Sequence, residues 1–331
     1  MRPGARRPAS AAAAFCAAAV CASAGPAQDV VLGLPIDCRL GATCHVQNHV
    51  DRDDGPGWAD YACGGLSYDG HEGTDFALPN LRAMRGGVDV LAAADGTVRA
   101  TRDVWPDISI RRPEAPDLGG QDCGNGVMID HGGGMSTQYC HLMFGSVGVR
   151  TGDEVAAGDT LGKVGLSGRT EFPHLHFTVR VGDETVDPFD ADGSAECDEG
   201  RSLWRETPDY AATGIVAAGI APRLPTYEEV QDTPPSDHAW PAAAGEAIVA
   251  WAYGFGLREG DVVRIALDGP GGVLHRADET IDGALAAFFR GGGRRAPAGG
   301  WPPGDYTGRI EVLRDGAVIA ARAVAATLTA P

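Results

Sequence analysis

The chain has 331 residues and a formal net charge of −18, with 45 acidic residues against 27 lysines and arginines. This length is enough for two domains, each with its own hydrophobic core. So large a negative charge argues against a protein that binds nucleic acid or an anionic membrane surface through bulk electrostatic attraction.

The N-terminus has the pattern of a secretory signal. Arginines precede an apolar run from Ala11 to Ala22, and Ala22-Ser23-Ala24 has the small-x-small form of a cleavage site. We therefore predict a signal peptide over residues 1–24 and an exported mature protein, either periplasmic or secreted. Removing this segment changes the formal charge from −18 to −21, because it contains three arginines and no acidic residue. No later apolar stretch is long enough to span a bilayer, so we expect no transmembrane segment after signal removal.

Six cysteines remain after that removal, and all of them precede residue 200. In an exported chain they predict three disulfides within the N-terminal half. A hairpin around the turn His131–Gly134 would place Cys123 and Cys140 diagonally opposite, just beyond disulfide reach, and a bulge at Gly124 could bring them together. Cys38–Cys44 would close a short local loop, which leaves Cys63–Cys197 as the third bond. This set is one of fifteen possible pairings.

Short strand-like segments separated by glycine-bearing turns follow a loop-rich lead-in that ends near Gly70. Their alternating pattern predicts an all-β domain with no helix of useful length. The predicted strands are Val88–Ala92, Thr97–Ala100, Gly126–Asp130, Thr137–His141, Thr160–Val164 and Leu175–Val181. A long Pro- and Arg-rich insertion, Thr101–Gln121, interrupts this rhythm. Loops of this length are usually functional or disordered, and we interpret this one as a wall of the functional groove.

The C-terminal part has a different composition. Residues 201–245 are rich in proline and are predicted to form a connector between the N-terminal domain, residues 25–200, and a second domain, residues 246–331. Asp315-Gly316 is a strong signal for a two-residue hairpin turn, because strand-like segments flank it on both sides. Together with further strand-like segments, it predicts a small Ig-like β-sandwich.

Three histidine-bearing segments suggest a metal site. His174 and His176 lie on a predicted strand, where alternation places both side chains on one face. His71 and Asp75 are four residues apart, and the glycines around His71 argue against a helix. His141 ends another predicted strand. Zinc accepts imidazole and carboxylate ligands, and a catalytic site uses three protein ligands plus a water molecule.

The order of these segments resembles the lysostaphin-type (LytM-like) zinc metallopeptidases, which are peptidoglycan endopeptidases. The resemblance extends from about Asp69 to Phe189 and includes the segments Gly124–Gly134, Gly152–Gly165 and Val186–Pro188. It implies an antiparallel β-sheet with an open groove and one Zn²⁺ per chain. The ligands implied are His71, Asp75 and His176, and the implied catalytic pair is His141 and His174.

The sequence therefore predicts a zinc-dependent endopeptidase that cleaves peptide cross-links or bridges in bacterial peptidoglycan. Which of the two unligated histidines is the base and which stabilises the oxyanion stays open. Glu72 and Glu171 are candidates for contacts with the ligands. One alternative is a non-catalytic regulator on the same fold, which would be expected to lack zinc ligands. Another is a wall-binding protein whose sandwich uses a shallow aromatic site formed by Trp251, Tyr253 and Trp301.

Overall fold

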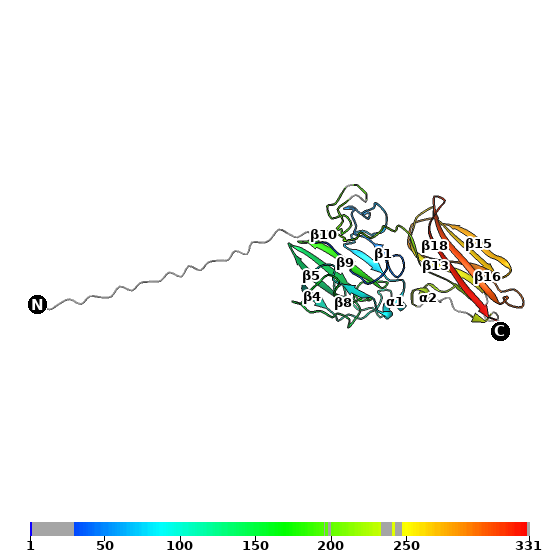
Figure 1. Ribbon diagram of the computed structural model, residues 1–331, viewed down its shortest axis with the longest axis horizontal. Coiled ribbons are helices and arrows are strands. Elements are labelled where there is room, and N and C mark those ends of the chain that lie inside the picture. The colour runs from blue at the N-terminus through cyan, green and yellow to red at the C-terminus, as the bar shows by residue number, and fades with distance from the viewer. Residues whose placement is uncertain (2–29, 195, 198–199, 233–239, 242–246, 330–331) are drawn as a thin grey trace.

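The computed structural model describes residue 1 and residues 30–329, apart from 195, 198–199, 233–239 and 242–246. The predicted signal peptide lies outside the described residues, except for Met1. Among the described residues, the two helices have six residues each, α1 (Leu81–Gly86) and α2 (Tyr227–Asp232). None of the described helices is long and apolar enough to cross a membrane. The predicted all-β fold with antiparallel sheets is confirmed (Figure 1).

The N-terminal unit, which holds strands β1–β10, is built on an eight-stranded antiparallel sheet in the order β1-β2-β9-β6-β5-β4-β7, with β10 paired to β9. Two further strands, β3 and β8, pair separately. The bounds are β1 (His45–Asn48), β2 (Thr74–Ala77), β3 (Asp89–Leu91), β4 (Gly96–Arg102), β5 (Gly126–Gly132), β6 (Met135–Cys140), β7 (Glu154–Val155), β8 (Thr160–Lys163), β9 (His174–Val181) and β10 (Glu184–Val186).

Side-chain alternation on the central strands separates a hydrophobic core from the opposite face of the sheet. Phe76 on β2 and Leu175 and Phe177 on β9 are fully buried in the core. Their neighbours along each strand therefore point to the other face, where polar side chains gather. Leu203 and Trp204, beyond the last strand of this unit, also belong to the same core.

The C-terminal unit, which holds strands β11–β18, consists of two sheets that pack around a second core. The sheet orders are β11-β13-β16 and β12-β18-β17-β14-β15, antiparallel except for the short β12–β18 pair. The bounds are β11 (Gly214–Ala221), β12 (Trp240–Pro241), β13 (Ala247–Leu257), β14 (Val262–Gly269), β15 (Gly272–Thr280), β16 (Leu285–Arg295), β17 (Gly304–Arg314) and β18 (Ala317–Thr329). The predicted Asp315-Gly316 turn joins β17 to β18 with positive φ at both residues, 51° and 79°.

Two features of the C-terminal part differ from the expectation. Residues 201–245, predicted as a connector, contain β11 and α2, because the small and β-branched residues of β11 pair with β13 over their whole length. The suggested shallow aromatic site is wrong for its tryptophans: Trp251 and Trp301 are 1% and 5% exposed. They fill the interior instead of lining a surface.

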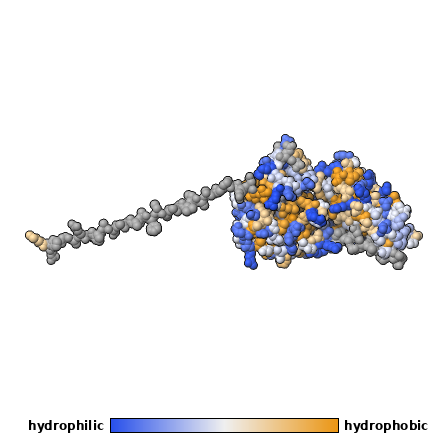
Figure 2. Space-filling model, viewed as in Figure 1, coloured by the Kyte–Doolittle hydropathy of each residue, from blue (hydrophilic) through white to orange (hydrophobic). Residues whose placement is uncertain are grey.

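The disulfides are the predicted set, Cys38–Cys44, Cys63–Cys197 and Cys123–Cys140. Gly124 has a positive φ of 64° beside the third of these bonds. The two units lie side by side, with α1 and α2 near their junction (Figure 1). The visible face of both units mixes apolar and hydrophilic residues (Figure 2).

Candidate metal centre and active site

The pairing of β2 with β9 brings together three residues of the candidate site. Asp75 lies opposite His176, and Ala77 lies opposite His174. Since alternate residues of these strands fill the core, Asp75, His174 and His176 share the polar face. His71 approaches from the turn before β2. Gly73 in that turn leaves room for a ring, because a Cβ there would lie 2.6 Å from Nε2 of His176.

Three donor atoms converge on one point of this face. His71 Nε2 lies 3.2 Å from Asp75 Oδ1 and 3.2 Å from His176 Nδ1, and the last two atoms are 2.8 Å apart. Ligands at the usual zinc distances in a tetrahedral site are separated by about 3.3 Å. Among the described residues, His71, Asp75 and His176 form the group of potential ligand side chains that lie close enough together to hold a metal ion. The donor set, two imidazoles and one carboxylate, fits zinc.

The outer contacts of these residues direct their donor atoms inward. His71 Nδ1 is 2.7 Å from the carbonyl oxygen of His49, so this nitrogen carries the hydrogen and Nε2 keeps its lone pair. Asn48 donates from Nδ2 to Asp75 Oδ2 at 2.8 Å. His176 Nε2 is 3.1 Å from the hydroxyl of Thr178. Each side chain is thus held in the orientation that a metal ligand needs.

The two remaining histidines lie beside this triangle. His141 Nδ1 is 2.8 Å from the carbonyl oxygen of Ser167, and His174 Nδ1 is 3.0 Å from that of Phe172. Both rings therefore turn Nε2 away from these backbone contacts, and the ring centroids are 4.7 Å apart. His174 Nε2 lies 3.4 Å from Asp75 Oδ1. The five predicted site residues are thus brought into one cluster.

His141 does not continue its strand as expected. Strand β6 ends at Cys140, and His141 has a φ of 63°, in the left-handed region that non-glycine residues rarely adopt. Its backbone N–H donates to the carbonyl of Cys123 at 2.9 Å, and its carbonyl accepts from Gly165 at 3.0 Å. These bonds, next to the Cys123–Cys140 disulfide, hold the backbone in a strained conformation of the kind that gathers at functional sites.

Burial and mutual charge set the protonation of the cluster. Burial alone would raise the pKa of the Asp75 carboxyl, but the adjacent histidines, first His71 and then His174, hold that pKa well below its ordinary value. Burial, reinforced by His174 and His176, lowers the pKa of His141 well below its ordinary value. Burial also lowers the pKa of His176. Burial acts on His71 in the same direction, but the adjacent Asp75 carboxylate outweighs it and raises the pKa of His71. A metal ion would displace that proton, because an ionised carboxylate and neutral imidazoles are the forms that bind a metal.

Glu72 and Glu171, the predicted candidates for contacts with the metal ligands, form ion pairs with arginines instead. Glu72 pairs with Arg180 at 3.3 Å, and Glu171 pairs with Arg111 at 2.5 Å. Both carboxylates are exposed, and no hydrogen bond of theirs to a ligand occurs among the described residues. Tyr68 was not anticipated: its ring packs on His71 with centroids 4.4 Å apart while half of the residue stays exposed.

The insertion Thr101–Gln121 lies against the segment that leads into His174. Ser109 Oγ donates to the carbonyl of Glu171 at 3.1 Å, and the N–H of Ile110 donates to that of Thr170 at 3.0 Å. Asn125 fixes the start of the insertion, because its Oδ1 accepts from two successive backbone N–H groups, at Val104 and Trp105, at 2.8 Å each.

Comparisons with known proteins agree with this geometry. The profile of peptidase family M23 matches residues 69–188. The chain is 34% identical over 121 residues to the peptidoglycan DD-endopeptidase ShyA of Vibrio cholerae, covering 37% of this chain and 23% of ShyA. It is 34% identical over 118 residues to the DD-carboxypeptidase/endopeptidase Mpg of Neisseria meningitidis, covering 36% of this chain and 22% of Mpg.

Among solved structures, the catalytic domain of lysostaphin from Staphylococcus simulans is 26% identical, with 36% of this chain and 76% of that chain covered and a TM-score of 0.27. The chain spans less than a quarter of the length of the two curated relatives named above. The matched residues include all five of the clustered side chains. Residues 69–188 therefore form a LytM-like domain of peptidase family M23.

Proposed function

We propose that this protein is a zinc-dependent endopeptidase that hydrolyses peptide cross-links or bridges in bacterial cell-wall peptidoglycan. The observation that carries the proposal is the convergence of His71 Nε2, Asp75 Oδ1 and His176 Nδ1 within 3.2 Å of one another. These atoms would hold one zinc ion per chain. Zinc, when bound, polarises a carbonyl and lowers the pKa of a water molecule toward neutrality.

His141 and His174 supply proton transfer in this proposal. Because each Nδ1 is engaged with a backbone carbonyl, each Nε2 presents a lone pair to the space beside the three donors. A neutral imidazole there accepts a proton from the attacking water, and a protonated one donates to the oxyanion or to the leaving amine. Their burial keeps competing bulk water away from both rings.

The names of the relatives support peptidoglycan as the substrate, since ShyA and Mpg are both described as endopeptidases and ShyA as a peptidoglycan enzyme. We infer that the protein is exported to the periplasm or secreted. The three disulfides support this inference, because such bonds persist in oxidising compartments.

Digestion of purified cell walls tests the proposal. The mature protein is incubated with walls that differ in their cross-bridges, and the released muropeptides are identified by mass. We expect loss of cross-linked dimers, abolition of that loss by a zinc chelator, and recovery on adding zinc. Wall binding without any cleavage would contradict the proposal and favour a regulator or a wall-binding protein.

A further inference from the structure

Strand β1 lies at one edge of the main sheet, and its C-terminal end contacts two of the three candidate metal ligands. Asn48 donates from Nδ2 to Oδ2 of Asp75 at 2.8 Å. The carbonyl oxygen of the next residue, His49, accepts from Nδ1 of His71 at 2.7 Å. Outer contacts of this kind fix the orientation of a ligand, so the placement of the end of β1 bears directly on the metal site.

An extra residue in β1 places Asn48 opposite Asp75. Val46 pairs with Phe76. An unbroken antiparallel register would next place Gln47 opposite Asp75, but the register shifts at this point and Asn48 takes that place. A β-bulge of this kind re-aims the side chains beside it. The contact between Asn48 and Asp75 therefore depends on how the extra residue, Gln47, is held.

The side chain of Gln47 is anchored to the C-terminal unit. It is buried, and its Nε2 donates to the carbonyl oxygen of Ala286 on β16 at 3.1 Å. Its Oε1 is 3.0 Å from Nε2 of His45, whose ring stacks on that of Phe255 on β13 with centroids 4.5 Å apart. Burial lowers the pKa of His45 to about 4, so the ring is neutral near pH 7, and Nε2 carries the hydrogen that Oε1 accepts. Both ends of the Gln47 amide are thus fixed at the junction of the two units.

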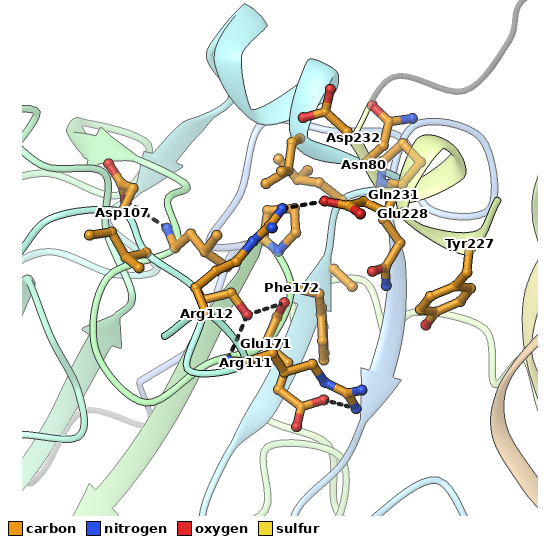
Figure 3. Close-up of a pocket in the computed structure, with 18 of the residues that line it drawn as sticks. Asn80, Asp107, Arg111, Arg112, Glu171, Phe172, Tyr227, Glu228, Gln231 and Asp232 are labelled. Carbon is orange, nitrogen blue, oxygen red and sulfur yellow. Dashed lines mark hydrogen bonds and ion pairs between the residues drawn. The ribbon is translucent and has the colours of Figure 1, made fainter. Parts of the chain in front are cut away.

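Another contact across the junction does not involve β1. A cavity of about 600 Å³ opens between the units, with His45 and Gln47 among its lining residues. In its wall, Arg112 of the insertion pairs with Glu228 of α2 at 2.7 Å (Figure 3). These two side chains are 52% and 70% exposed, whereas Gln47 is buried. Both contacts join the same two units, but the one through Gln47 lies next to Asn48 in the chain, so the ion pair provides a comparison within the molecule.

We propose that the C-terminal unit supports the metal affinity of the N-terminal unit, with Gln47 as the positioning residue. The bond to Ala286 fixes the extra residue of β1, and the bulge then keeps Asn48 opposite Asp75. This inference rests on the metal site of the proposed function. Since the three donor atoms themselves stay in place, losing the link weakens zinc binding without abolishing it. The β-sandwich thereby has a role within the chain that does not require it to bind the cell wall.

The zinc affinity of the full mature protein tests the link. Gln47→Met keeps the length of the side chain but cannot donate to the carbonyl of Ala286. Its zinc dissociation constant, measured by competition with a chromophoric chelator, should rise about tenfold, the lower end of the effect of losing an outer contact. Phe255→Leu, which weakens the stack on His45 without changing β1, should give a smaller rise. Glu228→Gln breaks the comparison ion pair and should leave the constant unchanged.

A double-variant cycle shows whether Gln47 acts through Asn48. In the Asn48→Ala background, Gln47→Met should raise the dissociation constant by a clearly smaller factor than in wild type, because the contact that it positions is already gone. A general loss of stability would not produce this dependence. Equal factors in both backgrounds would contradict the proposed route.

The same titrations separate this inference from the proposed function. Wild-type zinc binding with an unchanged constant in both Gln47→Met and Phe255→Leu, on protein whose fold is checked by circular dichroism, would overturn the inference and leave the metal site standing. A rise in Glu228→Gln as large as in Gln47→Met would also overturn it, because any loosening of the junction would then suffice. Wild-type protein that binds no zinc would overturn the metal site and this inference with it.

Discussion

Asn48 donates a hydrogen bond of 2.8 Å from Nδ2 to Oδ2 of Asp75. The two residues face each other across the β1–β2 pairing, next to an irregularity in the register. The bond turns Oδ1 of Asp75 toward His71 and His176, at 3.2 and 2.8 Å. Asn48 lies before the residues that match the peptidase family, so the lead-in orients a carboxylate of the candidate metal site whose three donors lie within that match.

Replacing Asn48 with Ala should weaken zinc binding while leaving the three donors in place. Loss of an outer hydrogen bond to a ligand typically costs about 10- to 100-fold in metal affinity. The zinc dissociation constant, measured by competition with a chromophoric chelator, should rise by that factor. An unchanged constant would mean that the carboxylate orients itself without Asn48.

Asn80→Ala is the matched control, since it also removes an asparagine side chain but at a position that caps a helix and does not contact a candidate metal ligand. Asn80 Oδ1 accepts from the N–H of Ala83 and caps α1. Its loss should lower the free energy of unfolding by about 1 kcal/mol. It should leave the zinc affinity unchanged.

The sequence was sufficient for the side chains whose placement follows from local strand geometry. Alternation predicts that His174 and His176 share a face, and glycines near His71 argue against a helix there. Asn48 could not be found in this way, because it lies 27 residues before Asp75 on a four-residue strand inside a loop-rich segment. Its contact depends on tertiary pairing, which local patterns do not encode.

The contact between the insertion and α2 could not be predicted from local patterns for a similar reason. The length of the insertion predicts a wall of the groove, whereas the prolines of residues 201–245 predict a connector where α2 lies. Side-chain ion pairs such as Arg112–Glu228 join positions more than a hundred residues apart. The left-handed backbone of His141 was equally unpredictable, because it results from long-range hydrogen bonds to Cys123 and Gly165.

Removing a donor atom should remove the metal. Ala at His71, Asp75 or His176 leaves two protein ligands where three are needed, so zinc content and peptidase activity should fall together. Zinc is measured by atomic emission on protein whose fold is checked by circular dichroism. Stoichiometric zinc in well-folded His176→Ala protein would refute the ligand assignment.

His141 and His174 should be separable from the metal. Ala at either position leaves the three donors intact, so zinc should stay bound while turnover falls by a factor of about 10²–10³. The comparison pairs zinc content with turnover for each variant. If His174→Ala lost its zinc while His176→Ala kept it, the two roles would be exchanged. Full activity in both His141→Ala and His174→Ala would argue against a hydrolase.

A fragment of the N-terminal unit should need residues beyond 200. The core includes Trp204, whose ring centroid is 5.7 Å from that of Phe177, and the backbone N–H of Leu32 donates to the carbonyl of Leu203 at 2.8 Å. Loss of a buried Trp alone costs about 3–5 kcal/mol, which is comparable to the stability of a domain. Residues 25–212 should therefore fold and keep zinc, whereas residues 25–200 should melt at a clearly lower temperature. Equal melting temperatures would contradict this.

Asp187 should make the protein less stable as the pH rises. Its Oδ1 accepts from the N–H of Phe189 at 2.9 Å, but its buried Oδ2 has no hydrogen-bond partner among the described residues. Burial raises the pKa of Asp187 from 3.8 to about 7. The folded protein therefore holds a proton that the unfolded chain has released between these values. Stability from this proton is full below the unfolded pKa and is lost as the pH rises through the folded pKa.

Between pH 5 and pH 8 this loss should amount to about 2 kcal/mol of the free energy of unfolding. Asp187→Asn is neutral throughout and should not show it. The quantity to measure is the difference in unfolding free energy between variant and wild type, because contributions of other titrating groups cancel in it. That difference should shift in favour of the variant from pH 5 to pH 8. A difference for Asp187→Asn that stays constant with pH would mean that Asp187 is ionised in the folded protein over this range.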